Sequence, residues 1–199
     1  MNLQDYKVLI LVVTAVVALI VASPALQRVL VYPQTEFFTE LWLLGPGHMA
    51  EGFPYNITRG ENYNMFLGIA NQLGRCAYYE VQVKFRNSTQ SAPDSFNRTS
   101  SSLPCLYSLN VFVADKETWE LPVAFGFDYS YDSNSSQVNF SRLLFNNAQL
   151  NLNGYSASWD SNRTAFFGNL IFELWIYNDS IGGFQYHERY VDLKFNMTV

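Results

Sequence analysis

The sequence predicts an all-β protein: an immunoglobulin-like antiparallel β-sandwich preceded by a single N-terminal transmembrane helix. One long apolar run stands near the N-terminus, and apolar and polar residues alternate through most of the remaining chain. Clusters of Gly, Pro, Asn and Ser separate the alternating segments, as turns do. The composition agrees, because 49% hydrophobic and 17% aromatic residues can fill a core, while 15% charged residues is low for a soluble domain.

The apolar run extends from Val8 to Leu26 without a charge. At about 1.5 Å per residue it just crosses a hydrocarbon core about 30 Å thick. A cleavable signal peptide is the alternative, since Ser23–Ala25 offers the small residues of a cleavage site. Apolar residues resume at 29–32, which favours an uncleaved anchor. We therefore expect a cytoplasmic stub and anchor in residues 1–33 and an extracytoplasmic domain in residues 34–199.

Small residues occupy one face of this predicted helix. Ala15, Ala18 and Ala22 are spaced at i, i+3 and i+7. Small side chains let the backbones of neighbouring helices approach closely. The face is a candidate for packing against partner helices, although alanine is also common in apolar segments generally. The span carries no charge, so it offers no ion pathway of its own.

A period of two marks the strands of the predicted sandwich. It is clearest in residues 79–86 and 190–197, where apolar residues alternate with polar ones such as Lys84 and Asn196. Such alternation predicts strands with one face in the core and one in solvent. Further strands are expected at Tyr63–Ala70, Tyr107–Ala114, Leu121–Tyr129, Gln137–Phe145 and Asn169–Tyr177. About seven short strands separated by turns are typical of a sandwich.

Sequons for N-linked glycosylation are unusually frequent. They are centred on Asn56, Asn87, Asn97, Asn134, Asn139, Asn162, Asn178 and Asn196. The content of Asn, Ser and Thr predicts about two by chance, and Asn- and Ser-rich turns explain part of the excess. Glycan acceptors place the residues after the helix outside the cell, because the flanking charges leave the orientation open.

The chain has two cysteines, Cys76 and Cys105. In an exported domain a single pair predicts one disulfide, and two free thiols are the alternative. The loop that it closes would stabilise the domain by about 3–4 kcal/mol in the chain-entropy model.

No sequence motif indicates catalysis or a cofactor. Nucleophile-elbow, zinc-protease, phosphate-loop and dinucleotide-binding motifs are all missing, and we expect no enzyme, no metal and no cofactor. His48 and His187 are far apart in the sequence and are interpreted as ordinary surface residues. The oxygen-rich segment Asp128–Asn134 lacks the glycine and glutamate of a calcium-binding EF-hand loop. Nucleic acid is an unsuitable partner, since the net charge is −5 and no basic cluster occurs.

Several segments resemble a known family. They are Thr35–Tyr63, Leu67–Asn71, Tyr79–Lys84, Glu117–Glu120 and Phe172–Tyr177. Together they are similar to an archaeal membrane-protein family catalogued as domain of unknown function 1616. The resemblance implies a membrane-tethered extracytoplasmic β-domain without established catalytic residues. Many relatives have several transmembrane helices, whereas this sequence contains one candidate span, which favours a small accessory subunit.

These observations lead to a single-pass protein of the cell membrane with an extracellular C-terminal domain. We expect a glycoprotein that acts through protein–protein contacts, as an accessory or structural subunit of a membrane complex or of the cell envelope. The alternative is a carbohydrate-binding surface module, because aromatic side chains stack on sugar rings. Candidates for that role lie in turn-rich segments, namely Tyr129, Tyr131, Tyr155 and Trp159.

Overall fold

A computed structural model describes residues 3–29 and 36–199 of the chain. It divides into two compact units, residues 1–36 and 37–199. The expected boundary between residues 33 and 34 lies outside the described residues. We refer to residues 37–199 as the β-domain.

The first unit contains one helix, α1 (Leu3–Val29). Within it, Tyr6–Ser23 is long and apolar enough to cross a membrane. The large apolar side chains of this segment are at least half exposed. Because apolar surface gains about 25 cal/mol per Å² on leaving water, such a helix needs lipid or another apolar environment. The predicted helix is confirmed, and it fits either a single-pass anchor or a signal sequence.

The β-domain confirms the all-β prediction. Its strands are β1 (Phe38–Leu44), β2 (Asn56–Ile57), β3 (Tyr63–Gln72), β4 (Ala77–Arg86), β5 (Tyr107–Val113), β6 (Thr118–Asp132), β7 (Gln137–Phe145), β8 (Ala148–Asn151), β9 (Ser156–Asp160), β10 (Ala165–Asn178) and β11 (Gly183–Met197). Every strand expected from the alternation is present. β1, β2, β8 and β9 were not anticipated, because they are short or lack a clear period of two.

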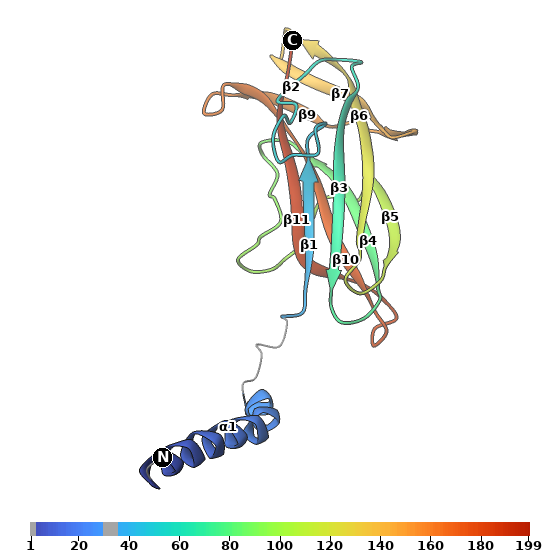
Figure 1. The fold of residues 1–199 in the computed structure, drawn as a ribbon. Helices are drawn as coiled ribbons and strands as arrows, with labels where there is room; N and C mark the ends of the chain where they lie inside the picture. Colours follow the sequence, from blue (N-terminus) through green and yellow to red (C-terminus); the bar gives the residue numbers. More distant parts are fainter. Residues whose placement is uncertain (1–2, 30–35) are drawn as a thin grey trace. The chain divides into compact units, whose positions relative to one another are not determined.

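The strands form one curled, mainly antiparallel sheet with two halves (Figure 1). The first half has the order β1-β3-β6-β7, with β8 and β9 pairing to β7. The second half has the order β5-β4-β10-β11-β2, in which only β2 is parallel to its neighbour. β9 joins the halves by also pairing with the start of β10. The immunoglobulin-like arrangement stays a prediction.

The core lies between the inner faces of these halves, where aromatic rings from both meet. Phe127 of β6 lies 5.2 Å from Phe195 of β11, and Phe145 of β7 lies 6.2 Å from Phe172 of β10, measured between ring centroids. All four side chains are fully buried. Tilted and edge-to-face aromatic contacts add about 0.5–1.5 kcal/mol each beyond the area that they bury.

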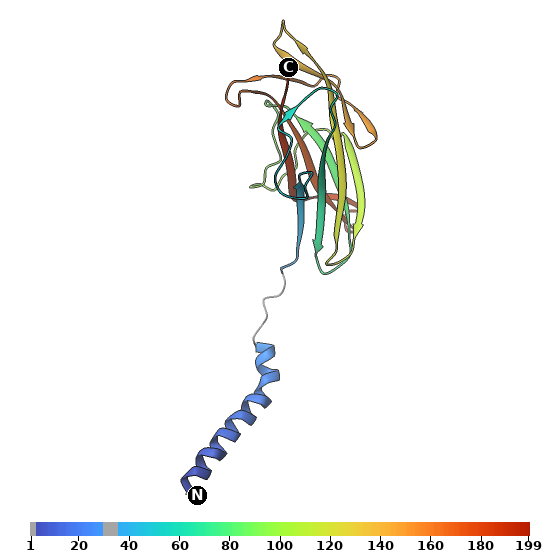
Figure 2. The ribbon, with the colours of Figure 1, turned by 45° about the horizontal axis from the view of Figure 1, so that its top comes forward.

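The two ends of the β-domain differ. The proximal end, where the chain enters the β-domain at Phe37, carries the short loops 73–76, 114–117 and 179–182. The distal end carries the β6–β7 turn and the C-terminus, which Figure 2 shows far from the start of β1. Different kinds of residue gather at these two ends.

Candidate interaction surfaces and a buried polar network

The predicted disulfide is wrong for this fold. Cys76 precedes β4 and Cys105 precedes β5, and both thiols are free and exposed. In the antiparallel β4–β5 pair, Val83 is opposite Tyr107, so Cys105 lies alongside Phe85. Nine residues of strand separate that position from Cys76, a distance of about 30 Å. A disulfide requires Cα atoms within about 7 Å, so the two cysteines cannot bridge within one chain.

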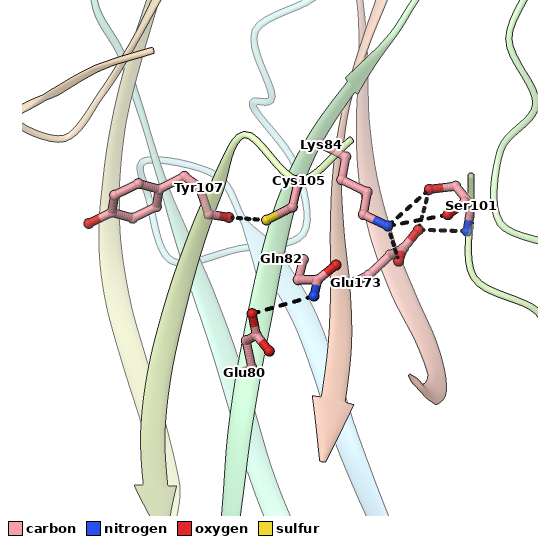
Figure 3. A network of polar contacts seen from close by, with 7 residues as sticks. All are labelled: Glu80, Gln82, Lys84, Ser101, Cys105, Tyr107 and Glu173. Carbon is pink, nitrogen blue, oxygen red and sulfur yellow. Dashed lines mark hydrogen bonds and ion pairs between the residues drawn. The ribbon is translucent and has the colours of Figure 1, made fainter. Parts of the chain in front are cut away.

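A buried ion pair lies on the outer face of the second half of the sheet (Figure 3). Lys84 of β4 donates from Nζ to Oε2 of Glu173 on β10, at 2.8 Å. The Ser101 hydroxyl donates to Glu173 Oε1 at 2.5 Å, and the Ser101 backbone N–H donates to the same oxygen at 2.9 Å. Lys84 also donates to the Ser101 carbonyl, at 3.3 Å. Lys84 is 3% exposed and Glu173 is completely buried.

This network corrects the prediction that Lys84 faces solvent. Its position does alternate with the core residues Val83 and Phe85, but Ser101 of segment 87–106 lies against Lys84 and Glu173 on the outer face, and Lys84 is buried there. Ser101 belongs to that segment, and its side chain is satisfied by Glu173 and Lys84 together. Lys84 and Ser101 are a residue pair able to act as base and nucleophile, yet both are buried and already hydrogen-bonded here. We infer that these hydrogen bonds and the ion pair hold segment 87–106 on the outer face of the sheet.

A groove follows the seam between β1 and β11, the strands at which the two halves meet. Three cavities of about 370, 180 and 500 Å³ lie along it. Ser95, from segment 87–106, lines all three. The groove walls come from β1 on one side, including Thr39 and Leu41, and from residues 185–192 of β11 on the other. We call this feature the seam groove.

At the proximal end, the floor of the seam groove is a chain of hydrogen bonds. His187 Nε2 lies 2.9 Å from Thr39 Oγ1, which lies 2.9 Å from the Tyr79 hydroxyl. Tyr79 donates to Asn71 Oδ1 at 3.2 Å, and Asn71 Nδ2 donates to the Val113 carbonyl at 2.8 Å. Thr39, Asn71 and Tyr79 are fully buried or nearly so. Burial lowers the pKa of His187 and raises that of Tyr79, since each charged form would lose its hydration.

A bulge in β11 places His187 in this position. The register with β10 shifts between Leu174 and Trp175, and Glu188 adopts a φ of 57°. A left-handed backbone is uncommon for a non-glycine residue inside a strand, and such bulges redirect side chains. The sequence suggested that His187 is an ordinary surface residue, whereas it is half-buried in the groove. The other histidine, His48, stacks on Phe66 with ring centroids 3.6 Å apart.

The groove carries both signs of charge, with cations prominent around the bulge. Arg98 and Arg189 line the groove cavity of about 370 Å³, and Arg98 pairs with Glu188 at 3.2 Å. This ion pair is well exposed, so it contributes little to stability. Its side chains remain available to a partner.

The sequons lie mostly at or near the distal end. Among the acceptor residues, Asn56, Asn97, Asn134, Asn139 and Asn162 are exposed, whereas Asn87, Asn178 and Asn196 are half-buried. Asn196 is constrained on both sides, because it donates to Asn56 Oδ1 and accepts from the Phe166 backbone N–H. Asn87 likewise donates from Nδ2, the atom to which a glycan attaches, to the Ser156 carbonyl at 2.7 Å. Attachment at either residue would require these hydrogen bonds to be lost.

Aromatic residues form two separate exposed groups. At the distal end, Tyr131 and Trp159 are 46% and 50% exposed and both lie edge-on to Phe166. The other candidates for sugar stacking are unsuitable, since Tyr129 is 4% exposed and Tyr155 packs against the core. The second group lies at the proximal end, around Phe112, which is 70% exposed.

The oxygen-rich segment 128–134 is occupied by internal contacts. Asp128 forms an ion pair with Arg142 on the neighbouring strand. Asp132 accepts from the Ser135 hydroxyl and from the Asn134 backbone N–H, and these bonds lower its pKa. Over residues 3–29 and 36–199, no three His, Cys, Asp or Glu side chains are grouped to hold a metal ion.

The fold thus defines a mostly β domain that follows one apolar N-terminal helix. A family model described as "Domain of unknown function (DUF1616)" matches residues 33–164, more than half of the chain. The chain belongs to this family, and the resemblance seen in the sequence is confirmed. No curated protein matches it.

Solved structures show only distant similarity. A β-glucosidase from Listeria innocua, in complex with gluconolactone, is 9% identical with a TM-score of 0.38; the match covers 84% of this chain and 17% of that one. A complex of zinc 2-glycoprotein and prolactin inducible protein from human seminal plasma gives 6% identity and a TM-score of 0.36. That match covers 84% of this chain and 98% of the matched chain. The chain spans under a fifth of the glucosidase.

Proposed function

We propose that this protein is a membrane-anchored extracytoplasmic glycoprotein that works by binding another protein, as an accessory or structural subunit of a membrane complex or of the cell envelope. The observation that carries the proposal is the seam groove between two strand edges. Within the described residues β1 pairs with β3 alone, and β11 pairs with β10 and, over two residues, with β2.

Unpaired strand edges are templates for an added strand. The edges of β1 and β11 that face the seam leave backbone N–H and C=O groups without a ladder partner over most of their length. A partner segment in extended conformation would gain main-chain hydrogen bonds along one edge, and the cavities beside it would accept alternate side chains. Arg98 and Arg189 favour an acidic residue of the partner near the bulge.

The anchoring and the glycosylation are also part of the proposal. Helix α1 supports a single membrane span, with the β-domain outside the cell, where exposed sequons such as Asn134 would receive glycans. Ala15, Ala18 and Ala22 lie in α1 as expected and stay candidates for helix packing. Replacing Ala18 and Ala22 by Leu should weaken co-purification with a partner subunit if that face packs against it.

We further propose that the protein is not an enzyme. The most chemically suggestive groups, Lys84, Ser101 and Glu173, satisfy one another in a buried site. His187 is held by Thr39, and its lowered pKa keeps it neutral at physiological pH. These groups stabilise the fold, which leaves recognition as the role of the surface.

Site-specific photo-crosslinking in native membranes tests the groove. A crosslinking residue at Ser95 should capture a defined partner, because Ser95 lines the whole groove. The same residue at Gln149, an exposed position on β8, is the matched control. Equal capture at both positions, or none at Ser95 in intact membranes, would contradict the groove as the binding site.

A carbohydrate-binding module is the second candidate. Its support is the exposed pair Tyr131 and Trp159 at the distal end. Binding to envelope polysaccharide that disappears in the Trp159→Ala variant, while crosslinking at Ser95 finds no protein, would favour this alternative.

A further inference from the structure

An unusual row of aromatic side chains crosses the second half of the sheet at its proximal end. Phe112 of β5 is the register partner of Tyr78 on β4, and Tyr177 of β10 is the partner of Phe184 on β11. Tyr78 and Tyr177 are neighbours, because the adjacent pair is Tyr79 with Ile176. One row therefore passes through four neighbouring strands, at one level along their length.

The rings of the row contact one another on the outer face. Tyr78 stacks on Phe112 with centroids 4.1 Å apart, and it lies 5.1 Å from Phe184 and 6.1 Å from Tyr177. Phe112 and Tyr177 are 70% and 38% exposed, whereas Lys84 beneath segment 87–106 is 3% exposed. A cavity of about 350 Å³ opens beside it, lined by Cys76, Phe112 and Tyr177 among others.

An aliphatic residue extends beyond the row. Ile181 is at the tip of the β10–β11 hairpin and is 63% exposed. The proximal loops carry charges of both signs, on Arg75, Asp115, Lys116, Glu117 and Asp179. Aromatic rings at one level with an aliphatic tip beyond them are arranged as membrane-interface residues are, since amphipathic rings favour the headgroup region.

The chain itself limits how far this end can be from the membrane. Eight residue steps separate Val29, the last residue of α1, from Phe37. A chain of that length spans at most about 28 Å, whatever its conformation. The proximal end is therefore the part of the β-domain that the covalent connection keeps within reach of the bilayer.

The positions of the sequons also favour the proximal end as the side facing the membrane. Six of the eight lie at or near the distal end, whereas Asn97 adjoins Arg98 beside the seam groove and Asn178 ends β10 at the proximal end. Its amide donates to Gln185 Oε1 at 2.9 Å and its side chain is half-buried, so it is a poor acceptor. Bulky glycans on the six distal residues would lie away from the aromatic row.

From these observations we propose that the proximal end is a lipid-binding surface: Tyr78, Phe112, Tyr177 and Phe184 lie in the headgroup region of the membrane that holds α1, and Ile181 enters the acyl boundary. This rests on the proposed anchoring by α1 but not on the seam groove. It gives the β-domain a defined orientation, which presents the proximal part of the groove beside the membrane and the distal sequons away from it.

The two native cysteines provide a matched test on the full-length chain in phospholipid vesicles. The Cys105→Ser variant leaves Cys76 for a fluorescent label beside the row, and the Cys76→Ser variant leaves Cys105 about 30 Å further along the sheet. Nitroxide groups on the lipid should quench the label at Cys76 several-fold more strongly than the label at Cys105. Adding Phe112→Asn and Ile181→Asn should remove most of that difference.

Each outcome has a separate meaning. Flotation with vesicles after an alkaline carbonate wash measures anchoring by α1, so a chain that fails to float contradicts the anchoring and this proposal together. A chain that floats but shows equal quenching at the two cysteines overturns the lipid-binding surface alone. Protection of Cys76 in native membranes without quenching in pure lipid vesicles also overturns it, and would assign the row to a protein partner.

Discussion

The buried pair of Lys84 and Glu173 gives the sharpest prediction about stability. We consider Glu173→Gln, which preserves the size of the side chain and removes its charge. The amide can still accept from Ser101, but Lys84 then keeps a buried positive charge without a counter-ion. The second half of the sheet would have to hold that charge beneath segment 87–106.

The expected loss follows from the burial. Removing one partner of a buried ion pair typically costs about 3–5 kcal/mol, because the remaining charge is uncompensated. The hydrogen bonds from Ser101 are charge-assisted and would weaken as well. We therefore expect Glu173→Gln to lower the free energy of unfolding by about 3–5 kcal/mol. The double variant Lys84→Met/Glu173→Gln should recover part of this loss, since it removes the uncompensated charge while the amide oxygen still accepts from Ser101.

Urea denaturation of the purified full-length chain, followed by near-ultraviolet circular dichroism, measures these differences. Hydrogen exchange of residues 88–104 reports on how firmly segment 87–106 is held on the sheet, and it should accelerate in Glu173→Gln. Arg142→Gln is the control, because its partner Asp128 is in a partly exposed ion pair, for which about 1 kcal/mol or less is expected. A loss below about 1 kcal/mol for Glu173→Gln, with unchanged exchange, would refute the reasoning.

Three further predictions concern single residues. Cys76 and Cys105 should both react with an alkylating reagent without prior reduction, and an intramolecular disulfide in the intact mass would contradict the β4–β5 register. Peptide mapping should find a glycan on the exposed Asn134 and none on Asn196, whose amide is hydrogen-bonded at both atoms. The folded chain binds the His187 proton less readily than the unfolded chain, because burial lowers this pKa from 6.5. Stability should therefore fall as the pH drops below about 6.5 towards the lowered pKa, and His187→Gln should flatten this dependence.

The sequence was sufficient to predict seven of the strands, because alternation is a local signal. β4 and β11 each show it over eight residues, and both follow it in the structure. The apolar helix was equally accessible, since length and lack of charge define it. Even so, alternation reports only that a residue points away from the core. It cannot report that Lys84 is then covered, because the covering Ser101 comes from a segment whose path depends on the whole fold.

His187 illustrates a second limit. Its place in the sequence gives no sign of burial, and the bulge that turns it towards Thr39 depends on how β11 pairs with β10. A left-handed Glu188 in a strand is not a propensity that a local pattern reveals. The bulge residues His187 and Glu188 line the seam groove, and so this part of the candidate binding site lay beyond what sequence patterns could indicate.

The same strand register accounts for both the failed disulfide and the aromatic row. The predicted disulfide depends only on compartment and on the number of cysteines, whereas the β4–β5 pairing sets Cys76 and Cys105 at opposite ends of one ladder. That pairing also brings Phe112 beside Tyr78, and the β10–β11 register adds Phe184 beside Tyr177. Four aromatic residues far apart in the sequence are thereby set at one level, near the end where the chain enters. Because grouped exposed apolar surface marks interaction sites, this row is the observation on which the proposed lipid-binding surface rests.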